Sequence, residues 1–224
     1  MPVIALLGGI VFYALASLGV RAKRHALERA ARVGAIALNA GLNVVIWAWI
    51  QPAWGALLGG ALGAIGLMSA VPPIARRRRF QALLGWASWL MPMSWLATGA
   101  GLVLFAAVLI ASPWLRTVRV RLDPSTGAIE TSGLPRIGFR GGFNLGNFTF
   151  LLGTPPTPFT AAGISSHETG HTLNVAAFGS VWHLIGNGVE QNLWPFRRGA
   201  HAYGELLAES RRPDSAQPTL PHWS

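Results

Sequence analysis

Two histidines and a glutamate form the group in this sequence that is best suited to chemistry. His167, Glu168 and His171 belong to an H-E-x-x-H pentapeptide, and four of the six histidines and four of the six glutamates lie between His167 and Glu209. On a helix, side chains four residues apart project from one face, so the two imidazoles could bind one metal ion. Glu168 could then reach a water molecule at the metal without being a ligand. Neutral imidazoles with a carboxylate suit Zn²⁺, so the pattern predicts a zinc site. The alternative is a helix that carries two histidines by chance.

A zinc site of this kind needs a third protein ligand, because catalytic zinc usually binds three side chains and keeps a fourth position for water. No third histidine follows at the spacing of the longer three-histidine motif. The candidates are therefore Glu205 and Glu209, which lie four residues apart in a later segment. We predict Glu209 as the ligand, since the apolar run 206–208 would hold its turn against the motif helix. Glu205 would then form a hydrogen bond to a ligand histidine and orient it, without binding the metal itself. His183 and Glu190 are weaker candidates.

The residues that precede the motif predict a small β-sheet. From Arg116 onward, apolar and charged residues alternate with the period of two that is typical of a strand. Turn-forming residues at 123–127 and a Gly-Gly pair at 141–142 indicate two hairpins. The expected strands lie at 118–122, 128–131, 137–140 and 143–152.

Two helices are expected after this sheet. Thr160 can cap a helix over 161–178 that a following glycine closes, and its apolar stripe turns both motif histidines inward. A final helix is expected over 199–211, followed by a polar tail over 213–224. We therefore assign 116–212 to one small α+β domain.

Residues 1–115 have the composition of a membrane protein. Only 12% of the chain is charged, whereas globular domains carry about 25%. Residues 1–20, 33–75 and 80–115 contain no charged side chain, and runs of about 20 apolar residues match a bilayer span. The sequence thus predicts an α-helical membrane protein with about four transmembrane helices and an interfacial helix near Trp86. The expected spans are 2–20, 33–50, 55–71 and 95–111.

The formal net charge of +10 does not indicate nucleic-acid binding. The basic residues gather at 21–32 and 76–79, next to apolar spans, which is the pattern of cytoplasmic loops beside anionic lipid headgroups. Four crossings would then place the domain that starts at Arg116 outside the cytoplasm. The absence of cysteine excludes disulfides and thiolate ligands. Seventeen arginines against one lysine, with abundant Ala and Gly, favour a bacterial source, and so the bacterial inner membrane.

The C-terminal half resembles the gluzincin group of zinc metallopeptidases. The resemblance rests on the order of a small sheet, an H-E-x-x-H helix and a later helix with a glutamate, and Glu209 matches by type and order. The chain is also similar to bacterial multi-pass membrane proteins that end in an H-E-x-G-H domain. The resemblance implies a zincin-like fold in which His167 and His171 bind zinc and Glu168 is the general base. The large helical subdomain that builds the gluzincin substrate cleft is missing.

The reaction that this resemblance implies is metal-assisted hydrolysis of a peptide bond. A tetrahedral oxyanion needs a hydrogen-bond donor besides zinc, and Tyr203 or His201 lies near Glu209 in the sequence. We name Tyr203 for this role, although it could equally be an aromatic residue of the core. The segment 143–148 could offer a strand edge to an extended peptide, or its glycine could mark a bulge.

Together these patterns predict a membrane-anchored zinc metallopeptidase that acts on peptides or proteins near the surface of the lipid bilayer. A competing hypothesis is a non-catalytic membrane scaffold in which zinc only fastens the small domain. An intramembrane protease is disfavoured, because Ser165, Ser166, Thr169, Thr172 and Asn174 make the motif helix too polar for lipid exposure.

Overall fold

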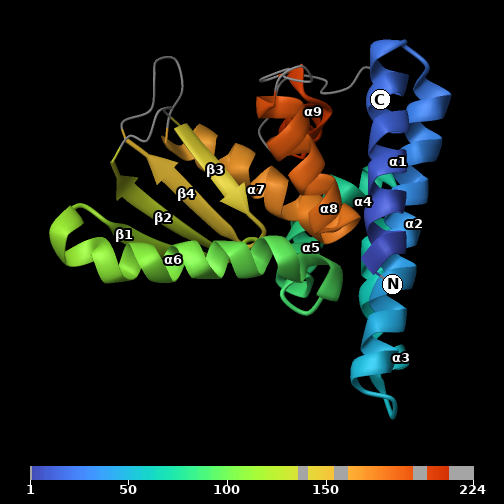
Figure 1. The fold of residues 1–224 in the computed structure, drawn as a ribbon, viewed down its shortest axis with the longest axis horizontal. Coiled ribbons are helices and arrows are strands. Elements are labelled where there is room, and N and C mark those ends of the chain that lie inside the picture. The colour runs from blue at the N-terminus through green and yellow to red at the C-terminus, as the bar shows by residue number, and fades with distance from the viewer. Residues whose placement is uncertain (1, 136–140, 154–160, 194–200, 212–224) are drawn as a thin grey trace.

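The computed structural model describes residues 2–135, 141–153, 161–193 and 201–211. Its elements form an upright group of helices and, beside it, a sheet with helices on both faces (Figure 1). The chain begins in the helical group and then builds the part that contains the sheet.

Three apolar helices form the upright group. Helix α1 spans Pro2–Arg21, α2 spans His25–Ile50 and α3 spans Gly55–Met68. A Cβ atom at Gly59 would lie 2.6 Å from the Cα atom of Val44, so small residues let α3 approach the backbone of α2 closely. The basic segment 21–32 is not a separate loop, because α2 already begins at His25. Most residues of its first two turns are exposed, but Glu28 and Arg32 are buried and form an ion pair at 3.0 Å.

Among the described residues, three helices are long and apolar enough to cross a membrane. They are Val3–Arg21, His25–Ile50 and Pro92–Leu115. The predicted span at 55–71 corresponds to α3, which is apolar but only 14 residues long. The coarse prediction of an apolar helical part followed by a small sheet is confirmed, whereas the number of crossings stays a prediction.

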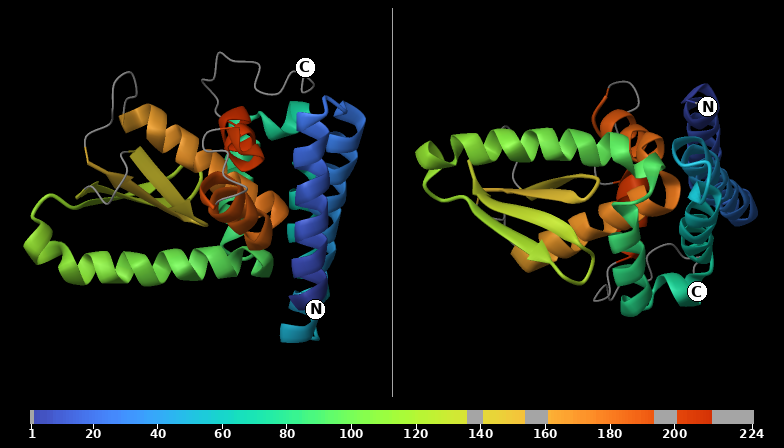
Figure 2. Two further views of the ribbon diagram at one scale, coloured as in Figure 1. Left: turned by 45° about the horizontal axis from the view of Figure 1, so that its top comes forward. Right: turned by 90° about the horizontal axis from the view of Figure 1, so that it is seen from below.

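A winding segment joins this group to the sheet. It contains α4 (Pro72–Ala75), α5 (Arg78–Ser88) and the short 3₁₀ helix η1 (Pro92–Ser94), followed by α6 (Trp95–Leu115). Helix α6 runs crosswise to α1 and α2 in all three views of Figures 1 and 2. It lies along the sheet for most of its length, and the sheet is held between α6 and α7 (Ala161–Phe178).

Within the described part of the chain, the sheet has four strands in the order β1-β2-β4-β3. Strands β1 (Arg119–Asp123) and β2 (Ala128–Leu134) are antiparallel, as are β3 (Gly141–Leu145) and β4 (Phe148–Leu152), while β2 and β4 are parallel. The predicted turn at 141–142 is wrong, because these residues begin β3. The turn is at Gly146-Asn147 instead. Gly146 has a φ of +65°, a backbone conformation that glycine adopts without steric cost. The expected strand at 137–140 lies outside the described residues.

The prediction of the motif helix over 161–178 is confirmed, since α7 has these bounds. After it come α8 (Ser180–His183), a π-helix η2 (Leu184–Glu190) and α9 (Tyr203–Ser210). Helix α9 packs against α7 and is shorter than the predicted 199–211 helix.

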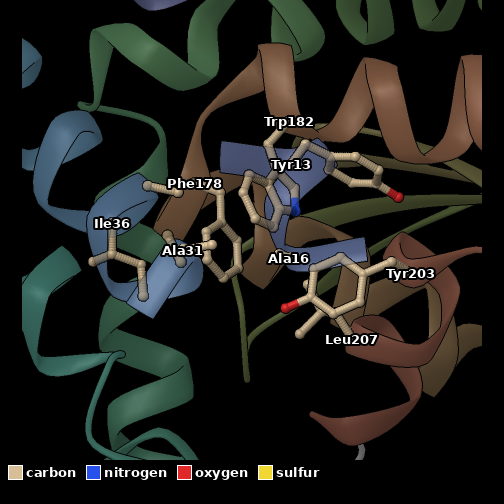
Figure 3. Packing of buried hydrophobic residues seen from close by; sticks show 10 residues of the cluster. Tyr13, Ala16, Ala31, Ile36, Phe178, Trp182, Tyr203 and Leu207 are labelled. Carbon is tan, nitrogen blue, oxygen red and sulfur yellow. The ribbon is translucent and has the colours of Figure 1, made fainter. Parts of the chain in front are cut away.

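A buried aromatic cluster joins the apolar helices to the C-terminal part (Figure 3). The rings of Phe178 and Trp182 stack at 4.5 Å, and Tyr13 meets Trp182 edge to face at 4.9 Å. Because α1 supplies Tyr13 and α9 supplies Tyr203 and Leu207, burial of this cluster holds α9 in place beside α7. The position of α9 therefore depends on the apolar helices.

Candidate metal centre

Three side chains from two helices converge on one point. His167 and His171 project from the same face of α7, and their Nε2 atoms lie 3.2 Å apart. Glu205, in the first turn of α9, places Oε2 3.0 Å from His167 Nε2 and Oε1 3.2 Å from His171 Nε2. One ligand atom from each of the three residues lies within 4.8 Å of the others. Two imidazole nitrogens and a carboxylate oxygen are a donor set that suits Zn²⁺, so the residues present fit the predicted ion.

Glu209 lies on the other side of the His167 ring. Its Oε2 atom is 3.0 Å from Nδ1 of His167, not near either Nε2 atom. An ionised carboxylate only accepts hydrogen bonds, so Nδ1–H of a neutral His167 donates to Glu209. The lone pair of His167 is then on Nε2 and points to the three-donor group, by which we mean His167, His171 and Glu205. The geometry therefore favours the reverse of the sequence-based assignment: Glu205 faces the metal position, and Glu209 orients a ligand histidine.

The electrostatics of the group favour a positive charge at its centre. Burial lowers the pKa of His167, but hydrogen bonds to Glu205 and Glu209 outweigh burial and raise it to about 10. Burial raises the pKa of Glu205, but hydrogen bonds and charge interactions with the two histidines outweigh it and hold the pKa well below its usual range. The carboxylates thus attract a cation, and metal binding would have to displace the additional proton of His167.

Glu168 lies beside this group and differs from the other carboxylates. It is 4% exposed, and its Oε2 atom has no hydrogen-bond partner among the described residues. Burial raises the pKa of Glu168, while the two motif histidines oppose that shift. Together with His171 and Glu205, it lines a cavity of about 660 Å³ that β3 borders on one side. A buried carboxylate with an unused oxygen next to a cavity is placed to exchange a proton with a molecule in that cavity.

The glycine of the motif explains how α9 comes so close to α7. A Cβ atom at position 170 would lie 2.9 Å from the Cα atom of Ala208 and would overlap the carbonyl oxygen of that residue. Only a glycine therefore lets the α9 backbone rest on α7, and this contact brings Glu205 and Glu209 to the histidines. The importance of Gly170 is not evident from the H-E-x-x-H pattern, in which that position is unspecified.

We expect Gly170→Ala to push α9 away from α7 and to weaken metal binding. Overpacking of this kind typically destabilises a protein by about 1–3 kcal/mol. Gly41→Ala is the matched control, since a Cβ atom there meets nothing within 4 Å and the change should stabilise α2 by about 0.5–1 kcal/mol. Zinc affinity and melting temperature of both variants check this. Equal affinity in both variants would show that the contact does not position the ligands.

Asn187 completes the surroundings of the histidines and was missed by sequence reasoning. Its Nδ2 atom lies 3.1 Å from His171 Nδ1 and 3.3 Å from Glu205 Oε1, so it links the two. It belongs to the π-helix η2, and single-turn π-helices often occur at functional sites. An asparagine in an irregular segment gives no signal from which this role could be predicted.

The structure does not bring Tyr203, the predicted oxyanion donor, to the cavity beside the metal position. Its ring is 1% exposed within the aromatic cluster (Figure 3). Its hydroxyl donates a hydrogen bond to Glu28 of α2. The physical reason is that the buried Glu28 carboxylate needs donors, and Tyr203 supplies one. The other candidate, His201, is exposed and does not line the cavity.

The two weaker ligand candidates, His183 and Glu190, do not belong to the group of donor atoms that could hold the metal. His183 lines the cavity, but its Nε2–H donates to the carbonyl oxygen of Asn144 at 2.9 Å, and burial lowers its pKa to about 4, so it stays neutral. Glu190 instead accepts hydrogen bonds from Tyr13 and Ser17 of α1, at 2.5 and 2.7 Å. It therefore ties η2 to the apolar helices.

Comparisons of the chain with protein-family models, with curated proteins and with solved structures gave no match.

Proposed function

We propose that this chain is a membrane-anchored zinc metallopeptidase that hydrolyses peptide bonds near the membrane surface. The observation that carries the proposal is the position of Glu168. Its carboxylate is buried, has an unused oxygen, and lines the same cavity as His171 and Glu205. A general base must lie within reach of the proton it removes, next to the group that activates the substrate.

The roles of the side chains follow from their positions. His167, His171 and Glu205 would hold the ion, and Glu209 keeps the His167 ring oriented. When bound, zinc supplies Lewis-acid chemistry, in that it polarises a carbonyl group and makes water acidic near neutral pH. Glu168 takes a proton from a water molecule in the cavity and gives it to the leaving amine. Burial raises the pKa of Glu168 above that of an exposed carboxylate, which makes it a stronger base for the first transfer.

The number of donors supports catalysis over a purely structural metal. Structural zinc sites are closed by four protein ligands, whereas catalytic sites bind three and keep one position open. Among the described residues, the metal-binding group contains three side chains, and a cavity of about 660 Å³ adjoins it. Both features are expected if a peptide or protein substrate enters there.

Helices α1 and α2 would anchor the protein in the bilayer, which we take to be the bacterial inner membrane. Both are long and apolar enough to cross it. The arginines at 76–79 favour a cytoplasmic position for that segment. The sheet domain would be extracytoplasmic if α6 crosses the bilayer, and it stays on the cytoplasmic side if α6 does not cross. The basic residues serve membrane topology in this proposal, and no nucleic acid is involved.

Removal of the metal tests the proposed activity. We expect the purified full chain to cleave peptides in a digest of bacterial proteins, and cleavage to stop with 1,10-phenanthroline and return with Zn²⁺. A peptide hydroxamate should inhibit it by occupying the open position. A protein that binds zinc stoichiometrically, cleaves no peptide and ignores the hydroxamate would instead be a scaffold with a structural zinc.

A further inference from the structure

Helix α6 has an apolar face on both sides, although only one of them is covered by protein. On the covered side, Leu104, Phe105 and Val108 pack under the sheet against a core that includes Phe148. A Cβ atom at Gly101 would lie 2.5 Å from the carbonyl oxygen of Leu145, so the backbone of α6 nearly touches the β3–β4 hairpin. Helix α6 is therefore fixed to the sheet along its length (Figure 2).

The uncovered side of α6 is a continuous apolar stripe. Leu96, Val103, Ile110 and Trp114 are 63%, 72%, 72% and 77% exposed. Their spacings of seven, seven and four residues place them on one face of a helix, over its whole length. Leu102 and Leu109 are also more than two-fifths exposed. An apolar stripe of this length on a protein surface marks an interaction site.

We propose that α6 does not cross the bilayer but lies in the plane of its surface, with this stripe inserted among the lipid acyl chains. If α6 crossed the bilayer, the sheet that packs against it would lie inside the apolar layer. Strands β1 and β3 are the edges of that sheet, and open sheet edges do not occur in contact with lipid because their backbone groups would lack partners. The exposed side chains of Arg119 and Arg121 on β1 would also enter the apolar layer.

Lipid, rather than a second protein chain, is the occupant that the surroundings favour. The stripe continues into an apolar hollow of about 650 Å³ in the corner between α6 and the helices α1 and α2. Leu6, Val45, Trp49 and Leu96 line this hollow, so the stripe is continuous with the surface of the membrane anchor. At the other end, exposed arginines at 116, 119 and 121 can meet anionic headgroups.

This placement has a consequence for the metal centre. The sheet separates α6 from α7, so the three-donor group lies one layer above the bilayer surface (Figure 2). The metal centre would therefore meet its substrates beside the membrane and not inside it. The placement of α6 does not rest on metal binding or on catalysis, and it can be tested without either.

Depth measurements on single cysteines test the proposal, and the chain has no cysteine of its own. The full chain would carry a fluorophore at Leu96→Cys, Val103→Cys or Ile110→Cys in vesicles of phosphatidylethanolamine and phosphatidylglycerol, with quenchers at defined depths in the lipid. Val3→Cys, Ile10→Cys and Leu18→Cys, at exposed positions on α1, are the matched controls for a crossing helix.

We expect the three α6 labels to share one shallow depth of about 5–10 Å below the headgroups, whereas the α1 labels differ from one another. Two results would overturn the proposal. Labels at 96 and 110 that differ in depth by about 21 Å, the length of fourteen helical residues, would make α6 a crossing helix. Labels that lipid quenchers do not reach at any depth would mean that protein, such as a second copy of the chain, covers the stripe.

Discussion

Replacing Glu168 with glutamine is expected to lower the rate of peptide hydrolysis by about 10²–10⁴-fold and to leave the metal content unchanged. The amide has nearly the same shape as the carboxylate but cannot accept a proton from water. Glu168 is not part of the three-donor group, so zinc affinity should hardly change. Initial rates of peptide cleavage at saturating zinc provide the measurement.

Glu130→Gln is the control for this experiment. Glu130 lies on β2, where it pairs with Arg121 at 3.3 Å, and it does not line the cavity. It should therefore retain the wild-type rate. If Glu168→Gln cleaved the same peptides as fast as the wild type, Glu168 would not be the general base, and the proposed mechanism would be refuted.

The second large effect is expected at Glu205, whose replacement by glutamine should abolish or strongly weaken zinc binding. Its carboxylate approaches both Nε2 atoms, so the change removes a charged ligand. Glu209→Gln, four residues along the same helix, is the matched variant. It removes only the acceptor for His167 Nδ1–H, and loss of such outer partners typically lowers metal affinity by about 10–100-fold.

Titration of both variants with zinc in the presence of a competing chelator separates the two roles. The order expected is wild type, then Glu209→Gln, then Glu205→Gln, from tightest to weakest. The opposite order for the two variants would restore Glu209 as the ligand, as the sequence pattern had suggested, and would mean that α9 turns or shifts when the metal binds.

Local patterns in the sequence predicted those parts of the site that lie within one element. The helix α7 was predicted with the bounds it has, because a capping residue, an apolar stripe and a closing glycine all agree over 161–178. The convergence of His167 and His171 follows from their spacing of four residues on that helix. The first hairpin was anticipated as well, whereas the second was predicted with its turn at 141–142 and has it at Gly146-Asn147.

Contacts between distant segments could not be predicted in the same way. The choice between Glu205 and Glu209 depends on where α9 rests on α7, and that is decided by the approach of Ala208 to Gly170. Tyr203 was assigned to the site because it is near Glu209 in sequence, yet its partner is Glu28, on a helix at the other end of the chain. No local pattern reports such a pair.

Helix α6 shows a different limit of sequence reasoning. Its residues are long and apolar enough to cross a bilayer, which is why a span was predicted at 95–111. One side of this apolar helix covers the sheet, as Phe105 and Phe148 illustrate with ring centroids 5.3 Å apart. Composition cannot distinguish a helix that is apolar because lipid surrounds it from one that lies between lipid and a protein core.

The measurement that tests the central claim most directly is the zinc content of the purified full chain, with His167→Ala and Glu168→Gln prepared in parallel. The three-donor group predicts about one zinc ion per chain in the wild type and in Glu168→Gln, and little or none in His167→Ala. A wild-type chain that binds no zinc, or a His167→Ala variant that binds as much as the wild type, would contradict the account.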